Sequence, residues 1–536
     1  MCGRPAWPPK VCVLFFFHEG VSARARAHAR PATPHLLSLT HVFPSLSTHT
    51  HALPPPPLLL SAKAGHPLYT KFGDHRGPLA LVHLALGALR AATGVRPPKA
   101  AGEGTANTAL AFTAGRLLAL HEGDLPYVLR VLCDGVVETL GRASLQLTDA
   151  KGRPIRPPLA SLTAHPKQDA DGFFAISYRL DQPLVRYVGM DKVDGAVRFD
   201  MPIALPEPVM MHDFAITSRY AVLLDVPLVF TPDAMVASKA AMPFTFKKER
   251  PTRFGLLPKM GGSGGGGAGG AAAAAAAAAP ITPRWFTLPG PGVMIFHVAN
   301  AHETKDGKAV KLYACVFDDF DLDLDGKLAR EATAGAAAGN SPPDHYARLC
   351  EITLDLEAGT ASRLPLCPLP GDFPRVPDAL VGREARFAYV ATMDAASPVP
   401  LFSGVAKVDL RKAGKKDAVV GLITHGPHRY GGECAFVADP ARRGEDAGFL
   451  VTFVHDESPA ARAASPDGKG TSELVVYDAK AMAAAPVARV PLPSRVPYGF
   501  HVHHMTEAEV CGQAGRAWGV VEAAAETADV VMGREE

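Results

Sequence analysis

Four histidines in this sequence stand beside short apolar runs of the kind that form β-strands. Imidazole is a common metal ligand, and it binds as a neutral donor suited to transition metals. A single histidine of this kind is more often a buried or surface residue than a ligand. Convergence of all four on one metal ion is a hypothesis that their long, irregular intervals can neither support nor exclude. The four are His165 in LTAHPK, His212 in MMHDFAIT, His297 in MIFHVANAHE and His501 in VPYGFH.

The segments that would position these histidines are short and strand-like. Beyond residue 105 the chain is a succession of runs rich in Val, Leu, Phe and Tyr, such as FFAISYRL, RYAVLLDVPLVF and GFLVTFVHD. The 50 Gly and 49 Pro favour many short elements joined by turns. The pattern predicts an all-β domain, either a β-propeller or a large sandwich, and no fixed repeat decides between them.

Composition restricts the classes of function. The formal net charge is only +2 over 536 residues, so we expect no nucleic-acid partner, because a phosphate backbone requires a broadly basic surface. The eight cysteines form no CxxC pair, which favours free thiols over a disulfide framework or a zinc site. No run approaches the roughly 18 consecutive apolar residues of a membrane-spanning helix, so we expect a soluble protein.

The start of the chain differs from the rest. Residues 1–73 contain one acidic residue, Glu19, together with several Arg and Lys and many Ser, Thr, Ala and His. This composition is typical of an organellar transit segment and predicts delivery to the chloroplast. The alternatives are a secretory leader with Val11–Phe17 as its apolar part, a disordered start and a cytoplasmic location.

Two further segments flank or interrupt the β-rich part, which would span residues 105–536. Residues 74–104 include PLALVHLALGALRAA, for which we expect a helical lead-in that is buried or makes peripheral contact with a membrane. Residues 261–279 read GGSGGGGAGGAAAAAAAAA. They lack the Lys and the Ser or Thr of a phosphate-binding loop, so we expect a flexible low-complexity insert.

The four histidine motifs, in this order, resemble those of the carotenoid cleavage oxygenase family, which includes plant and algal carotenoid cleavage dioxygenases and 9-cis-epoxycarotenoid dioxygenases. The similarity runs from about Thr105 to the end and takes in LALHEGDLPY, RFGLLPK, RWFTLPG, GDFPRVPDALVGREARFAY and GGECAFV. The resemblance implies a seven-bladed β-propeller with a dome of loops and short helices over its axis. It also implies a non-haem Fe(II) dioxygenase that cleaves a conjugated C=C bond of a carotenoid or apocarotenoid with O₂, giving two carbonyl products.

The resemblance also assigns roles to individual residues. Fe(II) would be bound by His165, His212, His297 and His501. Three carboxylates would hold imidazoles in one tautomer by accepting the hydrogen bond of the far ring nitrogen, namely Glu122 at His212, Glu433 at His501 and Asp372 at His297. The family usually has glutamate at the third position. Because aspartate is one methylene shorter, its backbone must lie closer or it must reach the imidazole through water, and we expect Asp372 to sit farther from His297 than the glutamates sit from their histidines.

A second departure from the family lies ahead of Thr105. Family members usually carry there a β-rich stretch with a Trp-Phe-Asp-Gly-Asp-Gly motif, and residues 1–100 show nothing similar. Since a propeller closes by pairing its terminal strands, the expected fold has room for an incomplete first blade. An inactive apocarotenoid-binding relative therefore stays open as an alternative. Within the family, cleavage of a shorter stilbene-like substrate is a second alternative.

Overall fold

The structure is a computed structural model that describes residues 11–15 and most of the chain from 106 to 514. Within that range the residues not described are 133–134, 150, 181, 238–242, 261–280, 323–345, 395–396, 398–400 and 500. The expected helical lead-in at 74–104 and the insert at 261–279 lie outside the described residues. The same holds for the expected transit segment, except for residues 11–15.

Six antiparallel sheets of four or more strands, here called blades 1 to 6, form the body of the protein. Blade 1 comprises β2 (Ala109–Thr113), β3 (Arg116–Leu120), β4 (Tyr127–Val131) and β5 (Val137–Arg142). Blade 2 comprises β6 (Lys167–Gln168), β7 (Phe173–Arg179), β8 (Leu184–Met190) and β9 (Val197–Ala204). Blade 3 comprises β10 (Phe214–Ile216), β11 (Tyr220–Asp225), β14 (Arg253–Pro258) and β15 (Arg284–Thr287). A separate hairpin of β12 (Leu228–Phe230) and β13 (Phe244–Phe246) is inserted between β11 and β14.

The remaining blades follow the same plan. Blade 4 comprises β16 (Met294–Glu303), β17 (Ala309–Phe317), β18 (Arg348–Asp355) and β19 (Thr360–Pro365). Blade 5 comprises β20 (Gly371–Arg375), β21 (Phe387–Met393), β22 (Phe402–Asp409) and β23 (Val419–Thr424). Blade 6 comprises β24 (Arg429–Tyr430), β25 (Ala435–Ala438), β26 (Gly448–Asp456), β27 (Thr471–Asp478) and β28 (Ala488–Pro491). Helical structure in the described residues is confined to the short elements α3 (Ala234–Ala237), η4 (Asp378–Leu380), η5 (Leu410–Lys412), α6 (Pro459–Ala464) and α7 (Glu507–Cys511).

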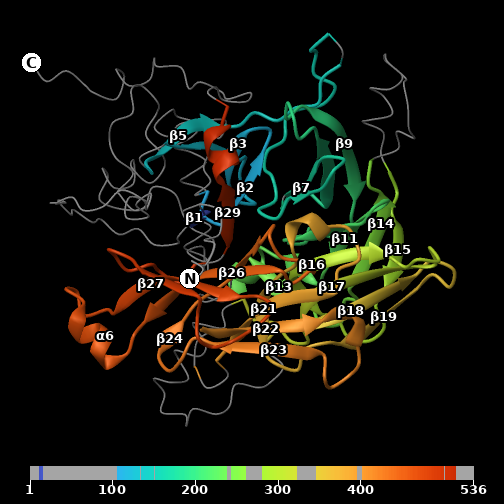
Figure 1. Ribbon diagram of the computed structural model, residues 1–536. Helices are drawn as coiled ribbons and strands as arrows, with labels where there is room; N and C mark the ends of the chain where they lie inside the picture. The colour runs from blue at the N-terminus through green and yellow to red at the C-terminus, as the bar shows by residue number, and fades with distance from the viewer. Residues whose placement is uncertain are drawn as a thin grey trace, which may run out of the picture.

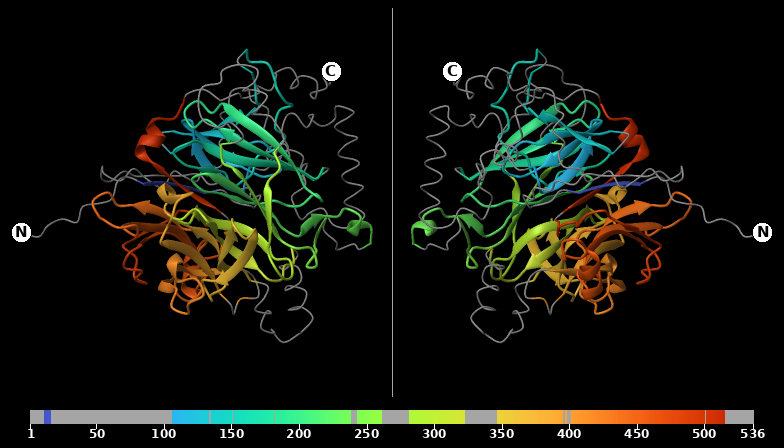
Figure 2. Two further views of the ribbon diagram at one scale, coloured as in Figure 1. Left: turned by 90° about the vertical axis from the view of Figure 1, so that its right-hand side faces the viewer. Right: turned by 90° about the vertical axis from the view of Figure 1, so that its left-hand side faces the viewer.

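The blades follow one another in chain order around a ring. In Figure 1 they run from the blue blade 1 at upper left, through the green blade 3 at right, to the orange blade 6 at lower left. After blade 6 the chain returns as β29 (Val502–Thr506), which contacts β25 of blade 6 and β2 of blade 1. The strand β1 (Val11–Phe15) pairs antiparallel with β29, and Figure 2 shows it in dark blue between the upper and lower blades. This two-stranded sheet stands where a further blade would close the ring.

The C-terminal segment after β29 also ties the ring to blade 1. The side-chain amide of Gln513 donates to the Val131 carbonyl at 2.8 Å and accepts from the Val131 N–H at 2.9 Å. The backbone N–H of Ala514 donates to the Gly115 carbonyl at 2.8 Å. Gly115 itself forms a tight hairpin turn with Ala114, and both have positive φ (69° and 50°), as a two-residue turn of this type requires.

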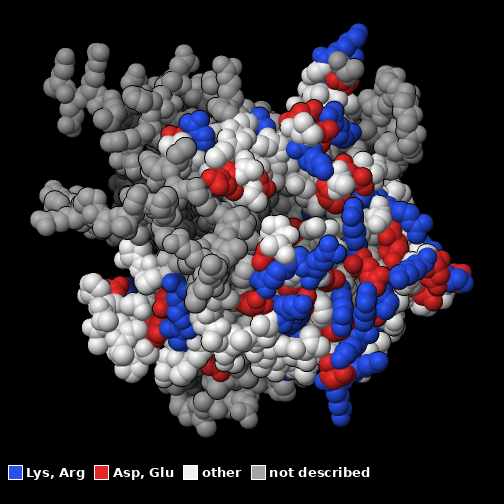
Figure 3. Space-filling view, viewed as in Figure 1, with Lys and Arg blue, Asp and Glu red and all other residues white. Residues whose placement is uncertain are grey.

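The strands form where the sequence supplies β-branched and aromatic residues, and most are buried on both faces because the blades pack against one another. Tyr187, Phe174 and Phe214, for example, are almost fully buried between blades 2 and 3. On the face seen in Figure 3, Lys and Arg side chains are interspersed with Asp and Glu over blades 3 to 5, in keeping with the small net charge. No helix in the described part of the chain is long and apolar enough to cross a bilayer.

The predicted all-β propeller is confirmed, with one difference in its blades. Six complete blades, and not seven, are found among the described residues, and the pair of β1 and β29 corresponds to the incomplete blade for which the sequence left room. Residues 11–15, within the expected transit or disordered segment, form a strand, and the assignment of residues 1–73 stays a prediction. Five cysteines of the described residues are free thiols in the structure: Cys315, Cys350, Cys367, Cys434 and Cys511.

Candidate metal centre

Each of the four histidines comes from a different part of the ring. His165 lies two residues before β6, His212 lies two residues before β10, His297 lies within β16, and His501 directly precedes β29. The strand β16 contacts both β10 and β20. The first strands of successive blades therefore bring to one point residues that are far apart in the sequence.

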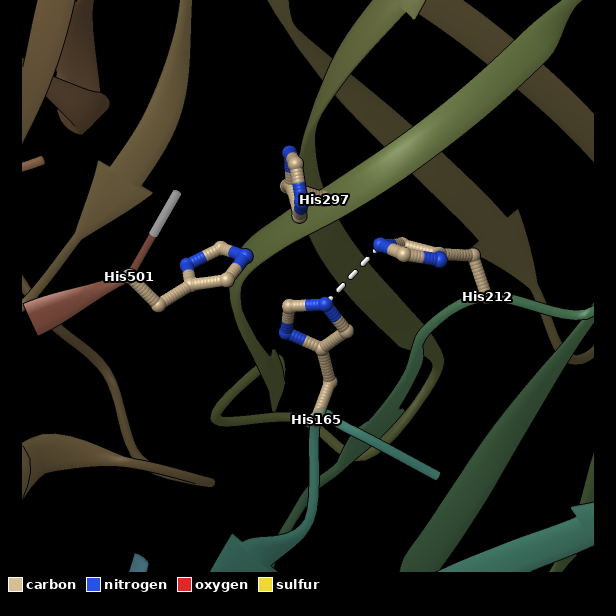
Figure 4. Close-up of side chains that lie close together, drawn as sticks. All are labelled: His165, His212, His297 and His501. Atoms are coloured by element: carbon tan, nitrogen blue, oxygen red, sulfur yellow. Dashed lines mark hydrogen bonds between the residues drawn. The ribbon is translucent and has the colours of Figure 1, made fainter. Parts of the chain in front are cut away.

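The four imidazoles converge, as Figure 4 shows. One nitrogen from each ring lies within 4.8 Å of the corresponding nitrogen of every other ring. Four points this close together all lie within about 3 Å of a common centre, which is the spacing expected of metal ligands when geometry is loose. The predicted convergence is confirmed. His302, His503 and His504, which are neighbours in sequence, are not part of the cluster.

Three carboxylates bind the far sides of three rings. Nδ1 of His212 donates to Glu122 at 3.1 Å, and Nδ1 of His501 donates to Glu433 at 3.1 Å. An ionised carboxylate can only accept a hydrogen bond, so Nδ1 carries the proton and Nε2 keeps its lone pair for the centre of the cluster. The predicted pairings of Glu122 and Glu433 are thus present in the structure.

The expectation for Asp372 was wrong. Its Oδ1 accepts directly from Nδ1 of His297 at 2.9 Å, no farther than the two glutamates lie from their histidines. The backbone compensates for the missing methylene: β20 has a register irregularity between Asp372 and Arg375, and Phe373 adopts a positive φ of 53°. The Phe373 N–H donates to the same Oδ1 at 2.9 Å and fixes the carboxylate in place.

Burial and neighbouring charges set the protonation of the site. Burial lowers the pKa of His165 well below its usual value, and the neighbouring histidines and Lys167 lower it further. Burial also lowers the pKa of His501, although Glu433 opposes the shift. Burial would lower the pKa of His297 as well, but Asp372 outweighs it and raises the pKa. For Glu433, burial opposes ionisation, but Arg375 and His501 lower the pKa to about 2.

The residues fit a bound divalent metal ion. Nε2 of His297 is buried and has no hydrogen-bond partner among the described residues. Nε2 of His165 lies 2.9 Å from Nε2 of His212, an arrangement in which two lone pairs repel unless one nitrogen is protonated or both bind a cation. Neutral imidazoles with carboxylates behind them form a common donor set for Fe(II) and similar metals.

Aromatic side chains surround the cluster. The ring of Phe373 lies 5.0 Å from that of His297 and 5.1 Å from that of His501. The ring of Phe296 lies 5.0 Å from that of His212, and the ring of Phe320 lies 5.2 Å from that of Phe296. These rings give the centre an apolar boundary.

Three charged residues near the site were not identified from the sequence. Asp213 is almost fully buried and lies 2.7 Å from the ammonium of Lys167. Arg375 lies 3.9 Å from Glu433. Asp213 was detectable in principle, because it follows His212 within the apolar run MMHDFAIT, where a buried acid needs a partner.

Comparisons with known proteins agree with the geometry. A sequence model of the family described as retinal pigment epithelial membrane protein matches residues 56–506. A carotenoid 9,10(9',10')-cleavage dioxygenase of Crocus sativus is 37% identical over 458 residues, covering 83% of this chain and 74% of that protein. A chromoplastic zeaxanthin 7,8(7',8')-cleavage dioxygenase of the same species is 34% identical, covering 77% of this chain and 98% of that protein. The chloroplastic 9-cis-epoxycarotenoid dioxygenase NCED1 of Oryza sativa is 34% identical, covering 85% and 63%.

Solved structures support the fold. A mutant of the Synechocystis apocarotenoid oxygenase superposes with a TM-score of 0.60 at 22% identity, covering 84% of this chain and 82% of that one. The Pseudomonas brassicacearum lignostilbene dioxygenase superposes with a TM-score of 0.58 at 24% identity, covering 76% of each chain. With a family match over most of its length and relatives at more than a third identity, this chain belongs to the carotenoid cleavage oxygenase family.

Proposed function

We propose that His165, His212, His297 and His501 bind Fe(II), and that the protein is a dioxygenase that cleaves a conjugated C=C bond of a carotenoid or apocarotenoid with O₂. The observation that carries this proposal is the cluster of four buried or half-buried imidazoles, three of them fixed in one tautomer by carboxylates. The relatives named as carotenoid cleavage dioxygenases, at up to 37% identity, support the choice of substrate.

Bound Fe(II) would supply the chemistry that makes O₂ reactive toward a C=C bond. Both oxygen atoms end in the two carbonyl products, so the overall reaction transfers no proton and the site needs no general acid or base. The imidazoles leave coordination positions free for small molecules. Glu122, Asp372 and Glu433 hold the Nδ1 protons and orient the rings, and the buried surroundings exclude water.

A polyene substrate needs an apolar path to the centre. The partly buried rings of Phe296 and Phe320, followed by Phe246 at 6.1 Å from Phe320, extend outward from His212. Aromatic rings of this kind would hold a flat, apolar chain in register with the metal. Because such substrates dissolve in lipid, peripheral membrane contact and delivery to the chloroplast belong to the same proposal, and several relatives are named chloroplastic.

The decisive experiment is an assay of purified protein, reconstituted with Fe(II) without oxygen and then exposed to isotopically labelled O₂. The substrates are full-length carotenoids, apocarotenoids and a stilbene, and the products are identified by mass. We expect labelled aldehydes or ketones from a carotenoid or apocarotenoid. Products from the stilbene alone would favour the stilbene reading, and iron binding without any product would favour an inactive binding protein. Either result would overturn the proposal.

A further inference from the structure

Asp213 has two carboxylate oxygens that contact three of the four segments carrying the histidines. Oδ1 accepts from the Phe214 N–H at 2.7 Å and lies 2.7 Å from Nζ of Lys167, two residues after His165. Oδ2 accepts from the Val298 N–H at 2.8 Å, directly after His297. Asp213 itself directly follows His212. Its side chain is only 2% exposed, so all these bonds are shielded from water.

The bond to Val298 stabilises an irregularity in β16. Ile295 pairs with Val316 and Val298 pairs with Ala314, so Phe296 and His297 together stand opposite the single residue Cys315. This two-against-one arrangement is a β-bulge, which redirects a side chain away from the regular alternation of a strand. The Asp213 carboxylate holds the backbone at the bulge and so helps to aim His297 at the centre of the cluster.

The ion pair with Lys167 extends the same support to His165. The Lys167 side chain is 16% exposed, so the pair is largely buried, and loss of one partner would leave an unpaired buried charge. His165 needs such support, because among the described residues its ring has no carboxylate partner like those of the other three histidines. The His165 N–H bonds only to Oγ1 of Thr163, at 3.1 Å.

The fourth histidine is supported differently. Glu433 binds both Nδ1 of His501, at 3.1 Å, and the following N–H of Val502, at 2.8 Å. At His297 these two tasks are divided, since Asp372 binds the ring and Asp213 binds the N–H that follows. Asp213 therefore fixes the backbone after His297, whereas Glu433 alone fixes both the ring of His501 and the backbone after it.

We propose that Asp213, with Lys167, is a positioning residue that holds His165, His212 and His297 at the spacing required by one metal ion. The inference rests on the proposed function in that the four histidines must bind a metal. It predicts that Asp213 affects metal affinity and geometry in addition to stability.

The test compares Asp213→Asn with Asp225→Asn. Asp225 is a matched control, because it is fully buried in the same blade and paired with Arg250 at 2.6 Å and Arg253 at 2.5 Å, away from the histidines. The asparagine at position 213 has an NH₂ group in place of one carboxylate oxygen. This donor would face either the Val298 N–H or the Lys167 ammonium, which are also donors. We expect Asp213→Asn to weaken Fe(II) binding by about 10- to 100-fold, the usual effect of losing a residue that orients metal ligands.

Two readouts separate positioning from stability. Fe(II) dissociation constants are measured without oxygen, and the visible absorption spectrum of the Co(II)-loaded protein reports the coordination geometry. We expect Asp213→Asn to change both, and Asp225→Asn to lower the melting temperature while changing neither. If both variants lose stability but keep wild-type affinity and spectrum, the inference is overturned.

Lys167→Met keeps the test decisive if Asp213→Asn does not fold. It leaves the Asp213 bonds to both backbone N–H groups in place, and we expect a several-fold loss of Fe(II) affinity because the buried Asp213 carboxylate loses its cationic partner. Unchanged affinity in Lys167→Met would overturn the inference. A wild-type protein that binds neither metal would overturn the proposed function and this inference together, whereas normal wild-type binding with unaffected variants overturns this inference alone.

Discussion

Asp372→Glu would introduce the side chain that is usual in the family, yet the structure predicts that it weakens iron binding. Asp372 is only 6% exposed and already accepts from His297 and from the Phe373 N–H through the same oxygen. The backbone at Phe373, with its positive φ, has adapted to the shorter side chain. A longer side chain has no gap to fill.

The size of the effect follows from the geometry. The added methylene lengthens the side chain by about 1.5 Å, whereas the carboxylate oxygen already lies 2.9 Å from the imidazole nitrogen. The glutamate must therefore fold back or displace His297, and forcing a methylene into a packed interior costs about 1–3 kcal/mol. If most of this cost falls on the metal-binding arrangement, Fe(II) affinity drops by about 10- to 100-fold.

The assay is an anaerobic Fe(II) titration of wild type and Asp372→Glu against a competing chelator. Glu433→Asp is the matched reverse change, and we expect it also to weaken binding, because the shortened side chain withdraws from His501 and Val502. Losses in both variants would show that each carboxylate is fitted to its own backbone. Affinity of Asp372→Glu equal to or tighter than wild type would refute this reasoning and restore the expectation drawn from side-chain length alone.

Four further predictions can be checked separately. Alanine at any of the four site histidines should remove bound iron measured by metal analysis, whereas His503→Ala should retain it, because His503 lies outside the cluster. Burial, aided by two arginines, lowers the pKa of His425 to about 4. Since its pKa in the unfolded chain is about 6.5, neutral His425 contributes up to about 3 kcal/mol of stability above pH 6.5, and this contribution is lost as the pH falls toward 4. The free energy of unfolding, measured with denaturant, should therefore decline less with falling pH in His425→Asn than in wild type. Phe320→Ala should raise KM for a carotenoid more than it lowers kcat, because it removes apolar contact outside the reacting centre. Deleting residues 1–15 removes the partner of β29 and should lower iron content, whereas deleting residues 1–10 should not; equal iron in both would mean that β1 does not support His501.

The sequence identified the four clustered histidines but not their arrangement in space. Motif resemblance selected His165, His212, His297 and His501, although the intervals between them carry no ligand spacing. A propeller explains why, since separate parts of the blade ring each bring one histidine to a common centre and the length of chain between them is free to vary. The convergence of the four histidines depends on the ring of blades and could not be predicted from local sequence patterns.

The hydrogen bonds that position the histidines could not be predicted from local sequence patterns. Asp213 and Val298 are 85 residues apart, and their hydrogen bond lies at a β-bulge that the text MIFHVANAHE does not predict. The distance from Asp372 to His297 was wrongly predicted because it was inferred from side-chain length, whereas the backbone of β20 lies close enough to His297 for direct contact. The missing family motif indicated an incomplete blade, but VCVLF reads equally well as the apolar part of a leader, so the pairing of β1 with β29 was not foreseeable.

The carboxylates around the cluster outnumber their cationic side-chain partners among the described residues. Four buried or half-buried carboxylates lie close to the histidines, and each accepts hydrogen bonds from N–H donors, which favours the ionised form. Two of them have a cationic partner, since Lys167 neutralises Asp213 and Arg375 lies beside Glu433. In the described part of the chain, Glu122 and Asp372 have only a histidine as ionic partner, which leaves two negative charges behind neutral imidazoles. Buried charge is costly unless it is compensated, so the protein around the four histidines favours a cation at their centre.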